Sequence, residues 1–118
     1  MSGPETRPLF VYGSLREPAV RARVLGRQAG IATCPAVLTG HVRELAPSFD
    51  YPFIVPAEAD ARVTGELLLG LRAEDYRALD HYEDVDEGLY VRTVVTVQTP
   101  AGEVEAFAYL RGPNAPGG

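Results

Sequence analysis

Short apolar runs separated by turn-forming residues predict that strands and helices alternate along the chain. Residues 9–12 form an apolar run that breaks at Gly13 and Ser14, which predicts a short buried strand followed by a tight turn. Residues 17–28 carry alanine, valine, leucine and arginine at helix-compatible spacing, and Pro18 is tolerated in a first helical turn. The chain therefore begins with a strand, a turn and a short helix.

The middle of the chain predicts further strands and a second helix. Residues 31–45 are mostly apolar but are interrupted by proline and glycine, so they predict one bent strand or two short ones. Residues 47–52, rich in proline and aromatic residues, predict a loop, and residues 62–71 return to strand character. Residues 73–83 contain good helix formers and neither glycine nor proline, so they predict a helix.

The last third of the chain has the pattern of a β-hairpin. Residues 89–99 form a long β-branched strand, residues 100–102 are turn-forming, and residues 104–110 supply a returning strand. The element order indicates an α+β fold with a mixed, mainly antiparallel sheet that can close into a small barrel, flanked by short helices.

Length and composition limit the classes of protein to consider. A chain of 118 residues is the size of one domain, here residues 1–118, and the uneven ends, residues 1–7 and 112–118, are expected to be loose. A net charge of −5 without a basic stripe argues against a nucleic-acid partner, and no apolar run is long enough to cross a membrane. With Cys34 as the single cysteine, no disulfide joins two parts of the chain, so a cytoplasmic location is expected.

The absence of lysine narrows the chemistry further. All eleven basic residues are arginine, so a Walker-type phosphate loop and a lysine Schiff base are excluded. His41 and His81 are far apart in sequence and no cysteine accompanies either of them, which argues against a zinc site. We therefore expect no metal and no cofactor. Cys34 is expected to be a small core residue rather than a reactive thiol.

The turn from Tyr12 to Leu15 is the first candidate for chemistry. Glycine at position 13 allows backbone N–H groups to point into a concavity that holds a carboxylate or an oxyanion. The alternative is a tight turn with only a structural role. Ser14 is a poor nucleophile candidate because it lacks the glycines that flank the serine of a hydrolase nucleophile elbow.

The second candidate is Glu83, at the end of the second predicted helix. Tyr76 and Leu79 mark the apolar stripe of that helix, and four further residues lead to Glu83, so its carboxylate is expected to point inward. Burial, the helix C-terminus and neighbouring aspartates would all raise its pKa toward a value useful for general acid–base catalysis. The alternative is a solvated acidic run over residues 83–87, which lacks the ligand spacing of a calcium loop.

Several segments, taken in order, resemble the γ-glutamylcyclotransferase-like superfamily, in particular its short AIG2-like branch. The resemblance covers most of residues 9–110. Its five matching segments are LFVYGSLR at 9–16, YPFIVP at 51–56, VTGEL at 63–67, the stretch from LDHYE at 79–83 to LYVR at 89–92, and AFAY at 106–109.

The resemblance implies a small barrel whose pocket receives a γ-glutamyl group, with Glu83 as the acid–base residue. It also implies substrate-binding roles for Tyr12, Gly13, Ser14, Leu15, Tyr90 and Tyr109. The implied reaction is attack of the substrate's α-amine on its own γ-carbonyl, which releases 5-oxoproline without a metal or cofactor. The turn would bind either the α-carboxylate or the oxyanion.

One position departs from the family pattern. Asp84 follows Glu83 where the superfamily often has glycine, and this like charge is expected to raise the pKa of Glu83 or to narrow the pocket mouth. The sequence does not specify the leaving amine, so γ-glutamyl amino acids, γ-glutamylamines and γ-glutamyl-protected metabolites are all candidate substrates. A catalytically silent binding module that keeps the barrel is the alternative function, and the sequence does not indicate an oligomeric state.

Overall fold

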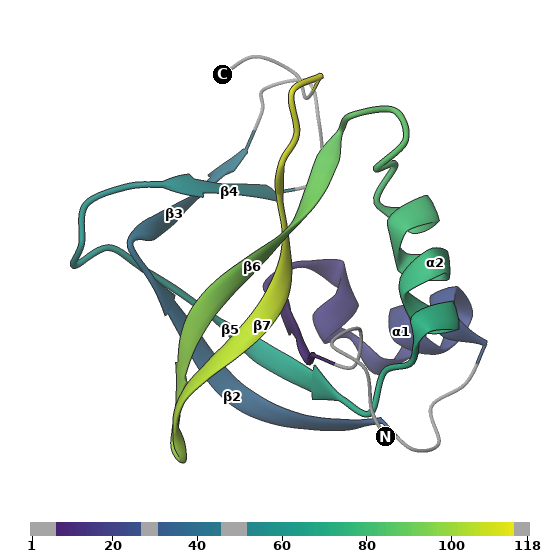
Figure 1. Ribbon diagram of the computed structural model, residues 1–118, viewed down its shortest axis with the longest axis horizontal. Coiled ribbons are helices and arrows are strands. Elements are labelled where there is room, and N and C mark those ends of the chain that lie inside the picture. The colour runs from purple at the N-terminus through teal and green to yellow at the C-terminus, as the bar shows by residue number, and fades with distance from the viewer. Residues whose placement is uncertain (1–6, 27–30, 46–51, 115–118) are drawn as a thin grey trace.

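The computed structural model describes residues 7–26, 31–45 and 52–114, and in this part of the chain five strands close into a barrel (Figure 1). Strand β1 pairs in parallel with β7, and every other neighbouring pair is antiparallel. The predicted α+β fold with a mixed, mainly antiparallel barrel is therefore confirmed. The order around the barrel is β1 (Leu9–Val11), β5 (Arg62–Leu69), β2 (Ala32–Thr39), β6 (Tyr90–Thr99) and β7 (Gly102–Arg111).

The short strand β1 is buried on both faces, which explains its uninterrupted apolar sequence. Alternate side chains of a strand point to opposite faces of a sheet. Accordingly, Phe10 packs inside the barrel with Leu38 and Val97, whereas Leu9 and Val11 pack on the other face in a second core cluster. That second core lies between the barrel and the helices, so β1 connects the two cores.

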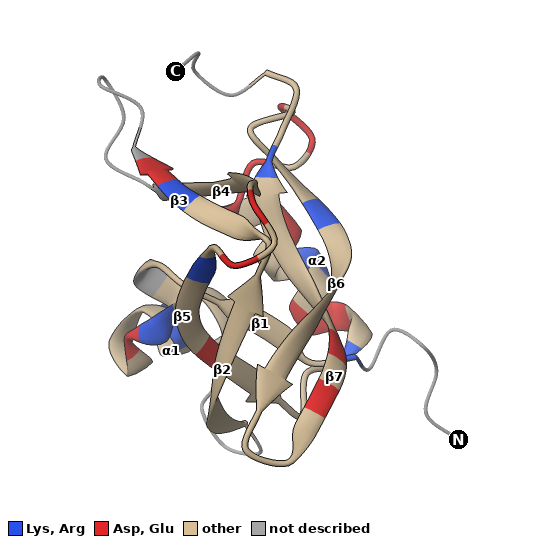
Figure 2. Cartoon of the chain, turned by 90° about the vertical axis from the view of Figure 1, so that its left-hand side faces the viewer, with Lys and Arg blue, Asp and Glu red and all other residues tan. Residues whose placement is uncertain are grey.

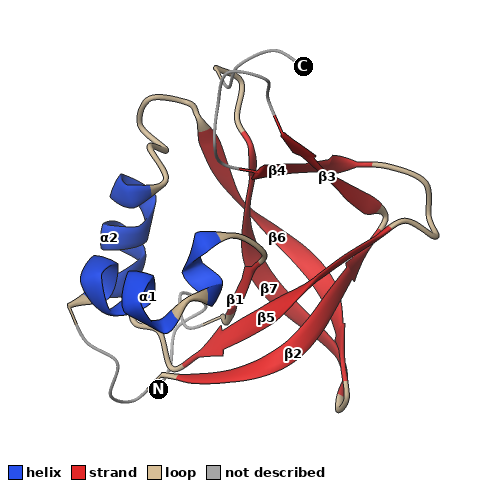
Figure 3. Ribbon diagram, turned by 180° about the vertical axis from the view of Figure 1, so that it is seen from behind, coloured by secondary structure: helices blue, strands red, loops and turns tan. Residues whose placement is uncertain are grey.

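The helices gather on one side of the barrel, as Figure 3 shows from behind. Helix α1 (Pro18–Leu25) and helix α2 (Ala73–Tyr82) contact each other, and α2 buries Tyr76 and Leu79 on its inner face as the sequence pattern predicted. Helix α1 is shorter than expected because Gly26 adopts a left-handed conformation (φ 73°) that ends it.

A separate two-stranded ribbon lies at the same end of the barrel as the connection from α2 to β6 (Figure 1). It pairs β3 (His41–Leu45) with β4 (Pro52–Pro56). The apolar region 31–45 thus forms two strands, β2 and β3, that meet at Gly40, which is one of the two predicted arrangements. Strand β4 was not predicted. Most of the predicted loop, residues 46–51, lies outside the described residues.

Gly65 lets β1 approach β5 closely. A Cβ atom at this position would lie 2.2 Å from the carbonyl oxygen of Val11 and 2.9 Å from the ring of Phe10, which is too close for any larger residue. Close packing against β1 therefore explains why position 65, in the segment VTGEL, is occupied by glycine. It fixes the position of β1, from which the turn at Gly13 emerges.

The ends of the described chain are held by hydrogen bonds. The Arg7 carbonyl accepts a hydrogen bond from the Tyr76 hydroxyl, and the amide of Gly112 donates to the Leu89 carbonyl. The rest of the expected loose ends, residues 1–6 and 115–118, lies outside the described residues.

Basic and acidic residues are interspersed over several elements (Figure 2). Within the described ranges, no helix is long and apolar enough to cross a membrane.

Candidate functional site

A pocket opens between the first turn of the chain and the segment that follows α2. Its described lining is mainly aromatic and aliphatic, with two carboxylates and no basic side chain. The lining residues are Phe10, Val11, Tyr12, Gly13, Leu15, Tyr82, Glu83, Asp84, Leu89, Tyr90 and Tyr109. This composition of apolar walls and a few polar groups is typical of a small-molecule site.

The end of α2 places Glu83 at the pocket. The Val85 amide donates to the Asp80 carbonyl and the Asp84 amide donates to the His81 carbonyl, which together form a Schellman cap with Glu83 as its capping residue. In this cap the residue after the capping position has a left-handed backbone, and Asp84 does so with φ 53°. The chain direction therefore reverses immediately after Glu83, and both acidic residues line the pocket.

Glu83 is partly buried, and its environment disfavours the charged form. Burial, followed by the charge of Asp84, raises the pKa of Glu83 to about 8. Of the effects on the pKa of Glu83 that the sequence led us to expect, burial and the charge of a neighbouring aspartate are present. A carboxyl group with this pKa exchanges its proton near neutral pH, as a general acid–base residue must.

Two tyrosines, Tyr12 and Tyr109, share the pocket lining with Glu83. Burial is the main cause that raises the pKa of both Tyr12 and Tyr109 above its ordinary value, and the charge of Glu83 contributes to each. The Tyr12 hydroxyl donates a hydrogen bond of 2.5 Å to the backbone carbonyl of Tyr109. The backbone of Ile54 in β4 also hydrogen-bonds the Tyr12 phenol, so the unpredicted strand supports the pocket wall.

The turn after β1 is a short 3-10 helix, Ser14–Arg16, and the side chain of Arg21 forms hydrogen bonds with its backbone. Arg21 is buried, and its Nη1 donates to the carbonyl of Leu15 at 2.9 Å and to that of Arg16 at 2.8 Å. The amide of Arg16 donates to the Gly13 carbonyl. These bonds fix the backbone that forms one side of the pocket.

Arg16 itself has no place in the pocket lining. Its side chain is 43% exposed and lies 3.9 Å from the carboxylate of Glu66. Gly13 and Leu15, and not the Arg16 side chain, are the residues through which this turn lines the pocket.

The structure brings most of the predicted site residues together. Tyr12, Gly13, Leu15, Glu83, Tyr90 and Tyr109 all line the pocket. Ser14 belongs to the same turn, and its side chain lies outside what the structure describes. Cys34 is partly buried against the barrel core, as expected for a small core residue.

Other lining residues were not identified from the sequence. Tyr82 and Leu89 lie in segments that resemble the family but were given no role in the site, and Phe10 was treated as part of a buried strand. Tyr82 could have been identified as a pocket residue because it is an aromatic residue that directly precedes Glu83 in the sequence. Within the described ranges, no group of histidine, cysteine and acidic side chains is arranged to hold a metal ion.

The arrangement suits a zwitterionic ligand. Among the described residues the pocket has no lining arginine, so backbone N–H groups of the turn are the donors to consider for a bound carboxylate. The carboxylate of Glu83 and the phenol oxygens nearby accept hydrogen bonds from an ammonium group. The pocket can therefore bind a molecule with both charges and exchange a proton with its amine.

Comparisons with known proteins give a consistent result. A family model described as γ-glutamyl cyclotransferase, AIG2-like, matches residues 9–117. Protein AIG2 C of Arabidopsis thaliana is 35% identical over 110 residues, which are 92% of this chain and 65% of that protein. AIG2-like protein C of the same plant is 33% identical over 110 residues, covering 92% of this chain and 62% of that protein. The chain thus spans less than two thirds of either relative.

Solved structures share the same architecture. An Arabidopsis thaliana protein studied in solution superposes with a TM-score of 0.76 at 32% identity, covering 94% of this chain and 65% of that chain. A mouse AIG2-like protein gives a TM-score of 0.72 at 26% identity, covering 93% of this chain and 80% of that chain. A γ-glutamyl cyclotransferase gives 0.72 at 23% identity, covering 89% and 66%, which shows a shared fold.

Proposed function

Because the chain belongs to the AIG2-like γ-glutamyl cyclotransferase family, whose model matches residues 9–117, we propose that it releases 5-oxoproline from a γ-glutamyl compound. The observation that carries the proposal is Glu83, a partly buried carboxyl with a pKa of about 8, in a pocket shared with the turn from Tyr12 to Leu15. Perturbed pKa values of this kind concentrate at functional sites.

In the proposed reaction the substrate reacts with itself. The ionised Glu83 takes a proton from the α-ammonium, and the α-nitrogen attacks the γ-carbonyl carbon to form a cyclic tetrahedral intermediate. Glu83 gives its proton to the leaving nitrogen as the bond between that nitrogen and the γ-carbon breaks, and the ring nitrogen loses its second proton to the departing amine or to solvent, which leaves the five-membered lactam. The products are 5-oxoproline and a free amine, and neither water nor an external nucleophile is consumed.

The polar groups of the pocket have separate proposed roles. The backbone of Gly13 and Leu15 binds the α-carboxylate or the oxyanion, and the side chains of Tyr90 and Tyr109 line the γ-glutamyl site together with Tyr12. Ser14 is proposed to contribute through its backbone. The aromatic walls keep the folded substrate conformer close to the attacking geometry.

The test is release of 5-oxoproline from γ-glutamyl amino acids, γ-glutamylamines and glutathione. Glu83→Gln keeps the size of the side chain and removes proton transfer, so activity should fall about 10²- to 10⁴-fold. Glu87→Gln is the matched control, because it neutralises an exposed acid in the same segment outside the pocket lining.

Two results would contradict the proposal. Undiminished turnover in Glu83→Gln would remove Glu83 from the mechanism. Failure of the unmodified protein to turn over any of the three substrate classes, while still binding a γ-glutamyl ligand, would favour the catalytically silent binding module instead.

A further inference from the structure

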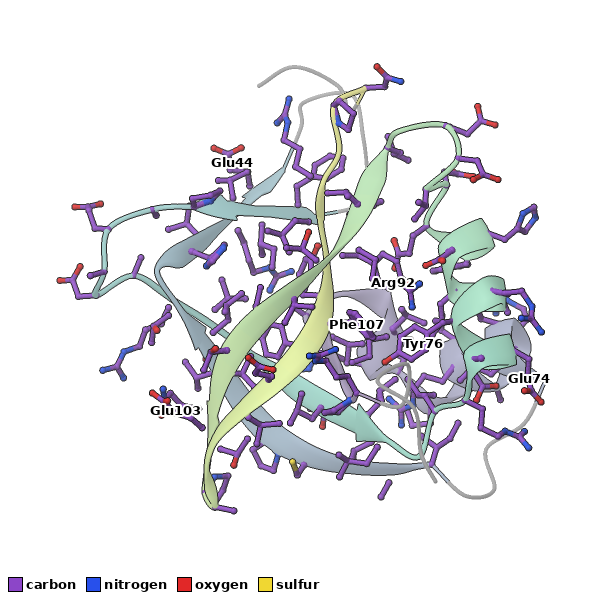
Figure 4. The ribbon with its side chains drawn as sticks, viewed as in Figure 1. Glu44, Glu74, Tyr76, Arg92, Glu103 and Phe107 are labelled. Atoms are coloured by element: carbon purple, nitrogen blue, oxygen red, sulfur yellow. The ribbon has the colours of Figure 1, made fainter. Side chains whose placement is uncertain are left out.

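A network of side chains between α2 and the β6–β7 hairpin contains Arg92, Tyr76 and Phe107 (Figure 4), and it ends at the hydroxyl of Tyr109. The guanidinium carbon of Arg92 lies 4.7 Å from the ring centroids of both Tyr76 and Phe107. Its Nε lies 3.4 Å from Oδ1 of Asp80. The same Oδ1 accepts a hydrogen bond of 2.6 Å from the Tyr109 hydroxyl.

This network fixes the direction of the Tyr109 hydroxyl. A phenol has one hydrogen, and here that hydrogen is directed at Asp80. Arg92, stacked on aromatic rings, lies beside the Asp80 carboxylate and holds it in place. Toward any group other than Asp80, the phenol oxygen of Tyr109 can therefore act only as a hydrogen-bond acceptor.

That acceptor belongs to the pocket. Tyr109 is 3% exposed, lines the pocket, and lies within the electrostatic influence of Glu83. Asp80 does not line the pocket, and its hydrogen bond to Tyr109 links its carboxylate to a residue that does.

We propose that Asp80 is a positioning residue that holds the Tyr109 hydroxyl as a hydrogen-bond acceptor for the α-ammonium of the γ-glutamyl substrate, beside Glu83. The inference rests on the proposed function, since it specifies how that site recognises its attacking nitrogen. The ammonium has three hydrogens, of which one goes to Glu83 and another bonds to Tyr109. After the proton moves to Glu83, the hydrogen bond to Tyr109 still orients the amine.

The test compares two ligands that differ only in the α-amino group. Glutamine γ-ethylamide carries the ammonium, and N-ethylglutaramate lacks it. Their affinities are measured by calorimetry in the Glu83→Gln protein, which does not consume the ligand. Adding Asp80→Ala should weaken binding of glutamine γ-ethylamide about tenfold, the effect of one hydrogen bond to a charged group. Binding of N-ethylglutaramate should change less than about twofold, which also reports an intact pocket.

Three variants show whether Asp80 acts through Tyr109. Tyr109→Phe should reduce the preference for the ammonium ligand as Asp80→Ala does, and the two changes together should reduce it no further. Asp80→Asn keeps an acceptor oxygen for the hydroxyl and should restore part of the preference. Asp86→Ala, which removes an exposed acid outside the pocket lining, should leave both affinities unchanged.

Equal losses for both ligands in Asp80→Ala would mean that Asp80 only supports packing, and unchanged affinities would mean that it has no role. Either result, together with 5-oxoproline release by the unmodified protein, overturns the role of Asp80 and leaves the proposed function intact. If the Glu83→Gln protein binds neither ligand and the unmodified protein releases no 5-oxoproline, both proposals are wrong.

Discussion

Asp84 follows Glu83 in a left-handed backbone conformation (φ 53°), and its charge adds to burial in raising the pKa of Glu83 to about 8. The Schellman cap that ends α2 requires this backbone conformation at position 84. Glycine adopts it without strain, which gives a physical reason for the glycine common at this position in the family. Aspartate tolerates it better than most residues and adds a negative charge to the pocket.

We predict that Asp84→Asn moves the pH dependence of activity to lower pH. Asparagine also tolerates the left-handed conformation, so the cap is kept while the charge is lost. Glu83 must be ionised to accept the proton, and a lower pKa increases its ionised fraction below pH 8. The measurement is kcat/KM for 5-oxoproline release between pH 5 and 9, where activity at pH 6 should rise roughly two- to fivefold.

The matched control for this change is Asp86→Asn, which neutralises an exposed acid two residues further on, outside the pocket lining. Its pH profile should match that of the unmodified protein. An identical profile in Asp84→Asn would show that the charge of Asp84 does not influence the proton transfer.

Asp84→Gly should stabilise the fold by about 1 kcal/mol, because glycine removes the strain of a positive φ. The free energy of unfolding is measured in urea at pH 5, where Glu83 is protonated and loss of the Asp84 charge has little electrostatic effect. At Asp86, where the backbone has no positive φ, the same substitution should instead be neutral or destabilising. A loss of stability in Asp84→Gly would contradict the strain argument.

The inward direction of the Glu83 side chain could be predicted from the sequence, because the helical repeat depends only on the spacing of nearby residues. Tyr76, Leu79 and Glu83 follow one face of α2, so the inward direction of the carboxylate could be read from spacing. The link from Asp80 to Tyr109 could not be predicted in this way. These two residues are 29 positions apart, and they meet because side chains of β7 pack against α2.

Proline misled the interpretation of β4 and complicated that of β2. Pro52 was the last residue of the predicted loop, but it begins β4, because a two-stranded ribbon has edges where a missing N–H is tolerated. Pro35 lies within β2 opposite Glu66, whereas pairing with β6 is restricted to Val37 and Leu38. Pro35 therefore needs hydrogen bonds on one side only, and the strand continues through it.

Glu83 should also make the stability of the fold depend on pH. Its folded-state pKa of about 8 exceeds the ordinary value of 4.5, so the folded protein binds more protons than the unfolded chain between these values. The contribution of this group to stability is therefore greatest below about pH 4.5 and is lost as the pH rises toward 8.

Comparison with Glu83→Gln isolates this contribution. The variant should gain stability relative to the unmodified protein as the pH rises from 5 to 8, by at most about 1.4 kcal/mol per pH unit. Urea unfolding at several pH values provides the measurement, and Glu87→Gln serves as the control with no such trend. A difference that is constant with pH would mean that the pKa of Glu83 is the same in both states.

Arg21 should stabilise both the fold and the ligand-binding turn. Its guanidinium donates to the carbonyls of Leu15 and Arg16, and the side chain is 9% exposed. Arg21→Met keeps the apolar stem and removes both bonds, so the free energy of unfolding should fall by about 1.5–3 kcal/mol. Because the turn then holds its backbone N–H groups less firmly, KM for 5-oxoproline release should rise more than kcat falls.

Arg23→Met, an exposed change on the same helix, should alter neither the free energy of unfolding nor KM. Equal stability of the two variants would show that the bonds from Arg21 do not hold the turn.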